Sequence, residues 1–313
     1  MIADLRNERY QRSCQGTAGL GRGRMGIAQK EKDCEKCMRY SNPLEEPMRV
    51  WICAWILALP WITPQLCAQS TASLPRTADG KLDLNGIWQA MNTADWDLET
   101  HGSVPGPVSS LGAIGAVPPG EGVVEGGTIP YLPAAAARQK ENYQRRWTDD
   151  PEIKCFMPGL PRATYLPYPF QIVQGANTIL ITYAYAGAVR TVRMGHPGKS
   201  PTDSWMGWSV GHWEGDTLVI DVTSFNDQTW FDRAGNFHSD ALHVVERYTP
   251  RGPDILDYEA SIEDPKVFSR PWKIGMPLYR HVEKNAHLME YQCIPYAEDV
   301  LYGHLRRAEG GSK

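Results

Sequence analysis

Residues 205–223, which read WMGWSVGHWEGDTLVIDVT, decide the fold of this protein. Two runs rich in Trp, Val, Ile and Thr are separated by the turn signal Glu214-Gly215-Asp216. Aromatic and β-branched residues favour strands, and a short connection that contains Gly between two such runs is typical of a β-hairpin. We therefore predict strands over Trp205–Trp213 and Thr217–Thr223.

Short strands separated by turn signals continue on both sides of this hairpin. Strands of this length and spacing indicate an antiparallel sandwich or barrel. We expect a mainly β fold, an antiparallel barrel or strongly curved sheet. The further predicted strands are Leu84–Ala90, Phe170–Gln174, Thr178–Tyr185, Ala188–Met194, Leu242–Tyr248, Ile255–Ile262, Trp272–Met276 and Leu288–Cys293.

The other segments predict one long helix and much irregular chain. Residues 134–147 consist mostly of strong helix formers and follow a proline, so we expect a helix there. Residues 295–307 fit a short terminal helix. Residues 101–133 are rich in Gly, Pro and Val, and residues 151–169 are rich in Pro. We expect segment 101–133 and the helix to pack against the barrel.

Residues 48–68 have the pattern of a signal peptide. Met48-Arg49 provides a positive start, and residues 50–62 are apolar. Leu66-Cys67-Ala68 then supplies a small residue at the cleavage position. We predict cleavage near Ala68 and a secreted or periplasmic protein.

This interpretation divides the chain into four parts. An uncleaved anchor behind a cytoplasmic extension and a lipoprotein at Cys67 remain as alternatives. The predicted parts are a mis-annotated upstream extension over 1–47, the signal peptide over 48–68, a linker over 69–78 and one β-rich domain over 79–307.

Charge and cysteine content exclude some functions. Of 32 basic and 36 acidic residues, 10 and 7 lie in residues 1–68, so the predicted mature part has a net charge of −7. Such a domain lacks the basic footprint of nucleic-acid binding, and its longest apolar runs are too short for stable membrane insertion. Only Cys155 and Cys293 follow residue 68, and an even count in an exported protein favours a disulfide over two buried thiols.

The densest set of chemically active side chains lies between the predicted strands 217–223 and 242–248. Loops on a β scaffold often carry catalytic groups, although Asx turns and strand caps also explain such residues. No zinc spacing or nucleotide fingerprint is present, and we expect neither a metal nor a cofactor. The candidate catalytic residues are His238, Asp240, Asp232 and Arg233.

Aromatic side chains form a second group of candidates. Ligand pockets are lined by aromatic residues with a few polar groups, and a Trp-rich core is the alternative explanation. The candidate ligand-binding residues are Trp205, Trp208, Trp213, Trp230, Phe231, His212, His243 and Arg247.

Three stretches together resemble a known family. They are DGKLDLNGIW at 79–88, the Cys-x-x-Pro-Gly-x-Pro-Arg element at 155–162, and the stretch from EGDTLVID at 214–221 through FNDQTW at 225–230 to HSDALHVVER at 238–247. With them the chain resembles a broad family of exported bacterial proteins that have no assigned activity. Gly86-Ile87-Trp88 also resembles the first strand of calycin barrels such as lipocalins, which implies a barrel with a ligand cavity.

We expect a secreted barrel that binds a small molecule, hydrophobic or ring-containing. The tryptophans would line its pocket, and the 225–240 loop would lie at the mouth. Two alternatives remain open. One is a metal-assisted or acid–base hydrolase or lyase that uses residues of the 225–243 segment, and the other is a structural or interaction protein without a pocket.

Overall fold

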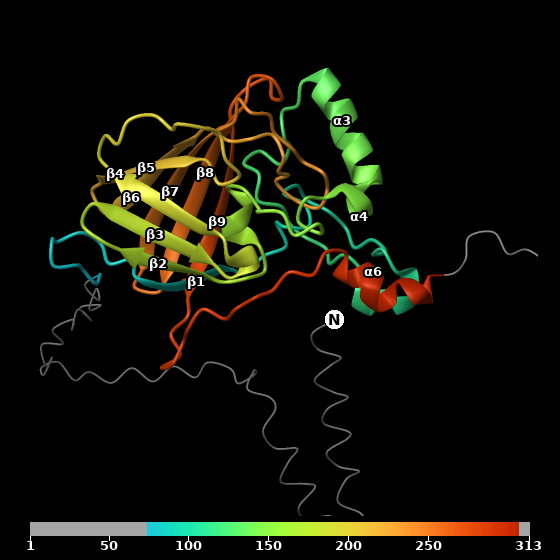
Figure 1. The fold of residues 1–313 in the computed structure, drawn as a ribbon, viewed down its shortest axis with the longest axis horizontal. Helices are drawn as coiled ribbons and strands as arrows, with labels where there is room; N and C mark the ends of the chain where they lie inside the picture. Colours follow the sequence, from blue (N-terminus) through green and yellow to red (C-terminus); the bar gives the residue numbers. More distant parts are fainter. Residues whose placement is uncertain (1–73, 307–313) are drawn as a thin grey trace, which may run out of the picture. The chain divides into compact units, whose positions relative to one another are not determined.

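The computed structural model describes residues 74–306, which form a closed β-barrel (Figure 1). Its nine strands follow one another around the barrel in sequence order, and β1 pairs with β9 to close it. The strands are β1 (Gly86–Ala90), β2 (Phe170–Gln174), β3 (Thr178–Tyr183), β4 (Val189–Met194), β5 (Trp208–Glu214), β6 (Thr217–Thr223), β7 (His243–Gly252), β8 (Ile255–Glu263) and β9 (Trp272–Arg280). The mainly β barrel predicted from the sequence is confirmed.

One strand pair departs from the antiparallel pattern that we predicted. All neighbouring strands run antiparallel except β4 and β5, which are parallel. Parallel neighbours need a crossover of about a dozen residues or more. Residues 195–207 supply this crossover, which is why β5 begins at Trp208 and not at Trp205.

The barrel interior is filled by side chains. Every second residue of β7 faces inward, and Val244, Glu246 and Tyr248 are fully buried. Glu246 forms an ion pair with Arg190 of β4 and accepts a hydrogen bond from Tyr258 of β8 at 2.8 Å. The interior is therefore a packed core that contains one ion pair.

Helices α3, α4 and α6 lie to one side of the barrel in Figure 1. The predicted helix over 134–147 is present but is interrupted at Arg145, where φ is −103°. The helices are α3 (Pro133–Gln144), α4 (Arg146–Asp149), α5 (Arg162–Tyr165) and α6 (Ala297–Tyr302), with 3-10 turns at η2 (Ser109–Gly115), η3 (Tyr185–Gly187) and η4 (Gly303–Leu305).

The last segment of the chain, residues 281–306, is here called the tail. The strand predicted over Leu288–Cys293 is absent from it, and residues 281–294 contain neither strand nor helix. Pairing of β1 with β9 closes the barrel and leaves no free sheet edge for another strand. The predicted disulfide between Cys155 and Cys293 is confirmed, with 5.6 Å between the Cα atoms. It joins the tail, and not a strand, to the proline-rich segment.

The predicted extension over 1–47, the signal peptide over 48–68 and linker residues 69–73 lie outside the described residues. Among residues 74–306, no helix is both long enough and apolar enough to cross a membrane.

Candidate functional site

His238 lies in the core. It is 1 % exposed, and its Nδ1 lies 2.8 Å from the carbonyl oxygen of Ser239. Because a carbonyl can only accept, Nδ1 carries the proton, and Nε2 accepts from the Thr229 hydroxyl at 2.5 Å. Burial lowers the pKa of His238, which keeps the ring neutral. Both ring nitrogens therefore serve to hold the 225–240 loop.

The two candidate aspartates occupy different environments. Asp232 is fully buried and accepts hydrogen bonds from the amide of Leu98 at 2.9 Å and from Asn236 Nδ2 at 2.6 Å. Burial, with the Asp97 carboxylate nearby, raises its pKa well above the ordinary value. Asp240 lies at the surface and pairs with Lys266 at 2.5 Å.

The four candidate catalytic residues do not share a site. Within residues 74–306, no hydrogen bond or ion pair joins any two of His238, Asp240, Asp232 and Arg233. The loop packs closely against the rest of the domain, so successive side chains enter the core or reach the surface. Of the four, only Arg233 lines the cavities described below.

The candidate ligand-binding residues are also dispersed. Trp230 and Phe231 are buried in the core, and Trp213 packs against it. On the outer face of the barrel, His243 pairs with Asp221 at 2.9 Å and Arg247 with Glu214 at 2.8 Å. The others lie elsewhere at the surface: His212 beside Glu214, Trp208 under Arg193, and Trp205 against Phe156. None of the eight lines any of the cavities described below.

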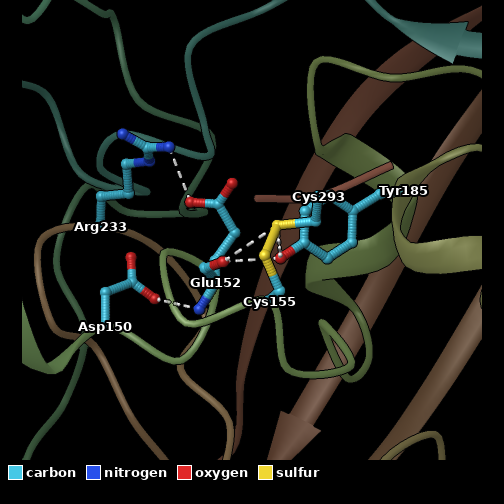
Figure 2. The surroundings of a disulfide bond; sticks show 6 residues. All are labelled: Asp150, Glu152, Cys155, Tyr185, Arg233 and Cys293. Carbon is cyan, nitrogen blue, oxygen red and sulfur yellow. Dashed lines mark hydrogen bonds and ion pairs between the residues drawn. A yellow bond between two sulfur atoms is a disulfide. The ribbon is translucent and has the colours of Figure 1, made fainter. Parts of the chain in front are cut away.

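A pocket of about 180 Å³ lies beside the disulfide, and we call it the disulfide-side pocket. The tail covers the segment around Glu152, and the amide of Tyr296 in the tail donates to the carbonyl of Ile153 at 2.8 Å. Tyr185, which lies outside the tail, donates its hydroxyl to the carbonyl of Glu152 at 2.7 Å beside the disulfide (Figure 2). The residues that give the pocket its chemistry are Trp147, Glu152, Tyr168, Arg233, Tyr291 and Glu298.

A buried ion cluster forms the floor behind this pocket. Arg162 of α5 binds both oxygens of Asp150, at 2.7 and 3.0 Å, and its Nε donates to Asp95 at 2.9 Å. All three side chains are at most 7 % exposed. A planar guanidinium held by two carboxylates is a rigid arrangement. The cluster thus provides a fixed base for the groups that reach the pocket.

Glu152 connects this cluster to the pocket. Its Oε2 lies 2.7 Å from Arg233 Nη2 and 3.7 Å from Arg162 Nη2. The first distance is that of an ion pair, and buried Oε2 makes no further hydrogen bond. Desolvation by burial raises the pKa of Glu152 to about 7, with Asp95 and Asp150 adding to it and Arg233 and Arg162 opposing it.

Aromatic rings provide one wall of the pocket. The rings of Tyr168 and Tyr291 lie 4.3 Å apart, and Tyr291 stacks on Tyr185 at 5.8 Å. Trp147 of α4 contributes a further ring. A buried carboxyl group, a guanidinium and several ring faces therefore meet in one small cavity.

Two neighbouring cavities have fewer free groups that could bind a ligand. A cavity of about 690 Å³ runs under residues 288–293, but its one carboxylate, Glu290, is exposed. A cavity of about 240 Å³ shares Trp147 and Arg233 with the disulfide-side pocket, but in it Arg233 stacks on Trp96 and Arg146 on Trp147. These ring faces are already covered by guanidinium groups.

The sequence interpretation missed Glu152, Trp147, Tyr168 and Tyr291. One signal was available, because Glu152 lies three positions before Cys155 in the acidic stretch Asp149-Asp150-Pro151-Glu152. A bridge to Cys293 necessarily brings this stretch close to Tyr291.

Among the residues that the structure describes, no group of three or more His, Cys, Asp or Glu side chains is arranged to hold a metal ion. No protein-family model matches the chain, and no curated protein is significantly similar to it.

Proposed function

We propose that this protein binds a small ring-containing molecule in the disulfide-side pocket. The observation that carries the proposal is the convergence of Glu152 and Arg233 with four aromatic residues, Trp147, Tyr168, Tyr291 and Tyr296, around one cavity. Ligand sites typically combine aromatic walls with a few polar groups of this kind. The proposal moves the site from the barrel interior, which is filled, to the outside of the barrel.

The size of the pocket limits the ligand. A cavity of about 150 Å³ is enough for benzene. The volume of about 180 Å³ therefore suits a molecule with one ring and a short substituent. The hydrolase or lyase alternative has less support, since its four residues have separate environments.

We also propose that the protein is exported. The signal-peptide pattern over 48–68 and the Cys155–Cys293 disulfide both support this proposal. Mass spectrometry of the protein from a periplasmic or culture fraction should find an N-terminus at Gln69. Recovery of the intact chain from the cytoplasm only would contradict export.

The family resemblance and the likeness to calycin barrels remain proposals as well. The Cys-x-x-Pro-Gly-x-Pro-Arg element contributes Cys155 and Arg162, which hold the proposed site in place.

Binding can be tested with three single-ring probes, benzylamine, benzoate and 4-methylphenol. In a titration of the purified protein followed by NMR, at least one probe should shift the Trp147 indole N–H signal, which a Trp147→Phe variant identifies. The shift should saturate, as expected for a formed cavity.

Ala297→Phe serves as the blocking variant, because Ala297 lines the pocket at the start of α6. Ala137→Phe is the matched control, since Ala137 is exposed on α3. Probe binding should be lost in Ala297→Phe and retained in Ala137→Phe. If no probe binds, or if both variants bind equally well, the proposed function fails.

A further inference from the structure

We propose that the disulfide-side pocket selects an organic cation, an amine on a single-ring scaffold, with Glu152 as its counter-ion. This inference rests on the proposed function and specifies the ligand class for the same site.

The charge balance around the pocket is negative. Two guanidinium groups, Arg162 and Arg233, stand against four carboxyl groups in the same network of ion pairs. At the rim, Arg306 and Asp299 neutralise each other at 2.6 Å. The four carboxyl groups are those of Asp95, Asp150, Glu152 and Glu298. A bound cation would reduce this imbalance, whereas a bound anion would increase it.

Arg233 is poorly placed to recognise an anion. Its guanidinium lies 2.7 Å from Glu152, 3.4 Å from Glu298 and 3.6 Å from Asp95. One face of the group also stacks on Trp96, 4.6 Å from the ring centre. An anionic ligand would have to displace carboxylates that are already paired.

Glu152 offers a place for an ammonium donor. Its side chain is 6 % exposed and lines the pocket, with Oε2 turned toward Arg233 at 2.7 Å. Because the two guanidinium groups beside Glu152 are shared among four carboxyl groups, a ligand ammonium next to this carboxylate is favoured. Aromatic faces attract cations as well, and the rings of Tyr168 and Tyr291 stand in the same cavity.

Protonation of Glu152 makes this recognition depend on pH. The pKa of Glu152 is about 7, so the counter-ion forms as the pH rises through neutrality. The charged groups that face Glu152 are Arg162 on α5, Arg233 in the 225–240 loop, Asp95 after β1 and Asp150 after α4. For an amine that stays protonated, affinity should therefore rise from pH 6 to pH 8.

The test compares benzylamine with benzoate and the neutral 4-methylphenol by calorimetric or NMR titration. Benzylamine should bind about tenfold more tightly than benzoate at pH 8, which corresponds to about 1.4 kcal/mol. Glu152→Gln should weaken benzylamine binding by a similar factor and remove its pH dependence, and it should change the affinity for 4-methylphenol much less. Glu290→Gln is the control, since Glu290 is exposed on the tail and does not line this pocket.

The outcomes separate this inference from the proposed function. Tighter binding of benzoate or 4-methylphenol than of benzylamine would overturn the cation proposal and leave the binding site intact. Equal loss of benzylamine affinity in both variants would also overturn it. Failure of all three probes would overturn the proposed function itself.

Discussion

Arg162 is the residue on which the buried ion cluster depends. It is 1 % exposed, and its guanidinium faces Asp95, Asp150 and Glu152. A carboxylate that loses its partner inside a protein keeps the full desolvation cost. The cluster can therefore tolerate changes at its rim much better than loss of its central cation.

Replacing Arg162 by Met should accordingly lower the free energy of unfolding by about 3–5 kcal/mol. The matched control is Arg145→Met, because Arg145 makes an exposed i,i+4 pair with Asp149. Such surface pairs contribute about 0.3–0.5 kcal/mol. Urea unfolding curves measure both changes, and similar losses in the two variants would contradict a central role for Arg162.

Glu152 should make stability depend on pH. Its pKa is about 7 in the folded protein, above the ordinary value of 4.5, so the folded state keeps the proton longer than the unfolded state. Proton binding by Glu152 therefore adds to the free energy of unfolding. This stabilisation is fully present below pH 4.5 and is lost as the pH rises through 7. Glu152→Gln should flatten the fall in stability between these values. Since one pKa unit is worth about 1.4 kcal/mol, the change should reach a few kcal/mol.

Thermal denaturation at several pH values checks this expectation. Glu298→Gln is a suitable comparison, because Glu298 pairs with the same Arg233 but is 46 % exposed. An unchanged pH slope in Glu152→Gln would show that another group is responsible.

At the scale of elements, the tail depends on the disulfide. Residues 281–294 lack regular structure, and α6 has no buried residue. The bond from Cys155 to Cys293 and the Tyr296–Ile153 hydrogen bond hold this segment over the pocket. The pocket thus exists because two segments distant in the sequence are linked covalently.

The double variant Cys155→Ala/Cys293→Ala should release the tail. Hydrogen exchange at the Tyr296 amide should become faster, while the β7–β8 hairpin should keep its protection against local opening. The chain-entropy model predicts a loss of up to about 5 kcal/mol in global stability for a sequence separation of 138 residues. An unchanged Tyr296 amide would mean that packing alone holds the tail.

At the scale of the whole molecule, the barrel is stabilised by a core that includes the Arg190–Glu246 pair. Arg190 also donates to Ser209 at 2.8 Å, and both members of the pair are at most 2 % exposed. The pair links β4 to β7 across the interior. This packing explains why the proposed ligand pocket lies outside the barrel.

Removing one member of this pair should therefore lower the free energy of unfolding more than removing both. Glu246→Leu alone should lower the free energy of unfolding by about 3–5 kcal/mol. The double variant Arg190→Met/Glu246→Leu should be more stable than Glu246→Leu by at least about 1 kcal/mol. Arg247→Met is the control, because Arg247 lies next in the chain but on the outer face, in an exposed pair with Glu214. A double variant less stable than Glu246→Leu in urea would contradict this account.

Local sequence determined the strands, because turn residues bound them. Phe170–Gln174 and Thr217–Thr223 were predicted with the boundaries that the structure has. The disulfide followed from the cysteine count after residue 68 in a chain that the sequence predicts to be exported. The parallel β4–β5 pair and the missing strand at 288–293 were not predictable in this way, since both depend on how the sheet closes.

Only the tertiary structure decided which polar side chains line a pocket and which are used within the core. His238 and Asp232 have the residue types of catalytic groups, but their hydrogen bonds within the core use their polar atoms. Glu152 has no distinctive local pattern, because its pKa and its pocket arise from Arg233, Asp95 and a tail far away in the chain. Strand formation is a property of neighbouring residues, whereas the charge state of a buried carboxyl group depends on groups that only the fold brings together.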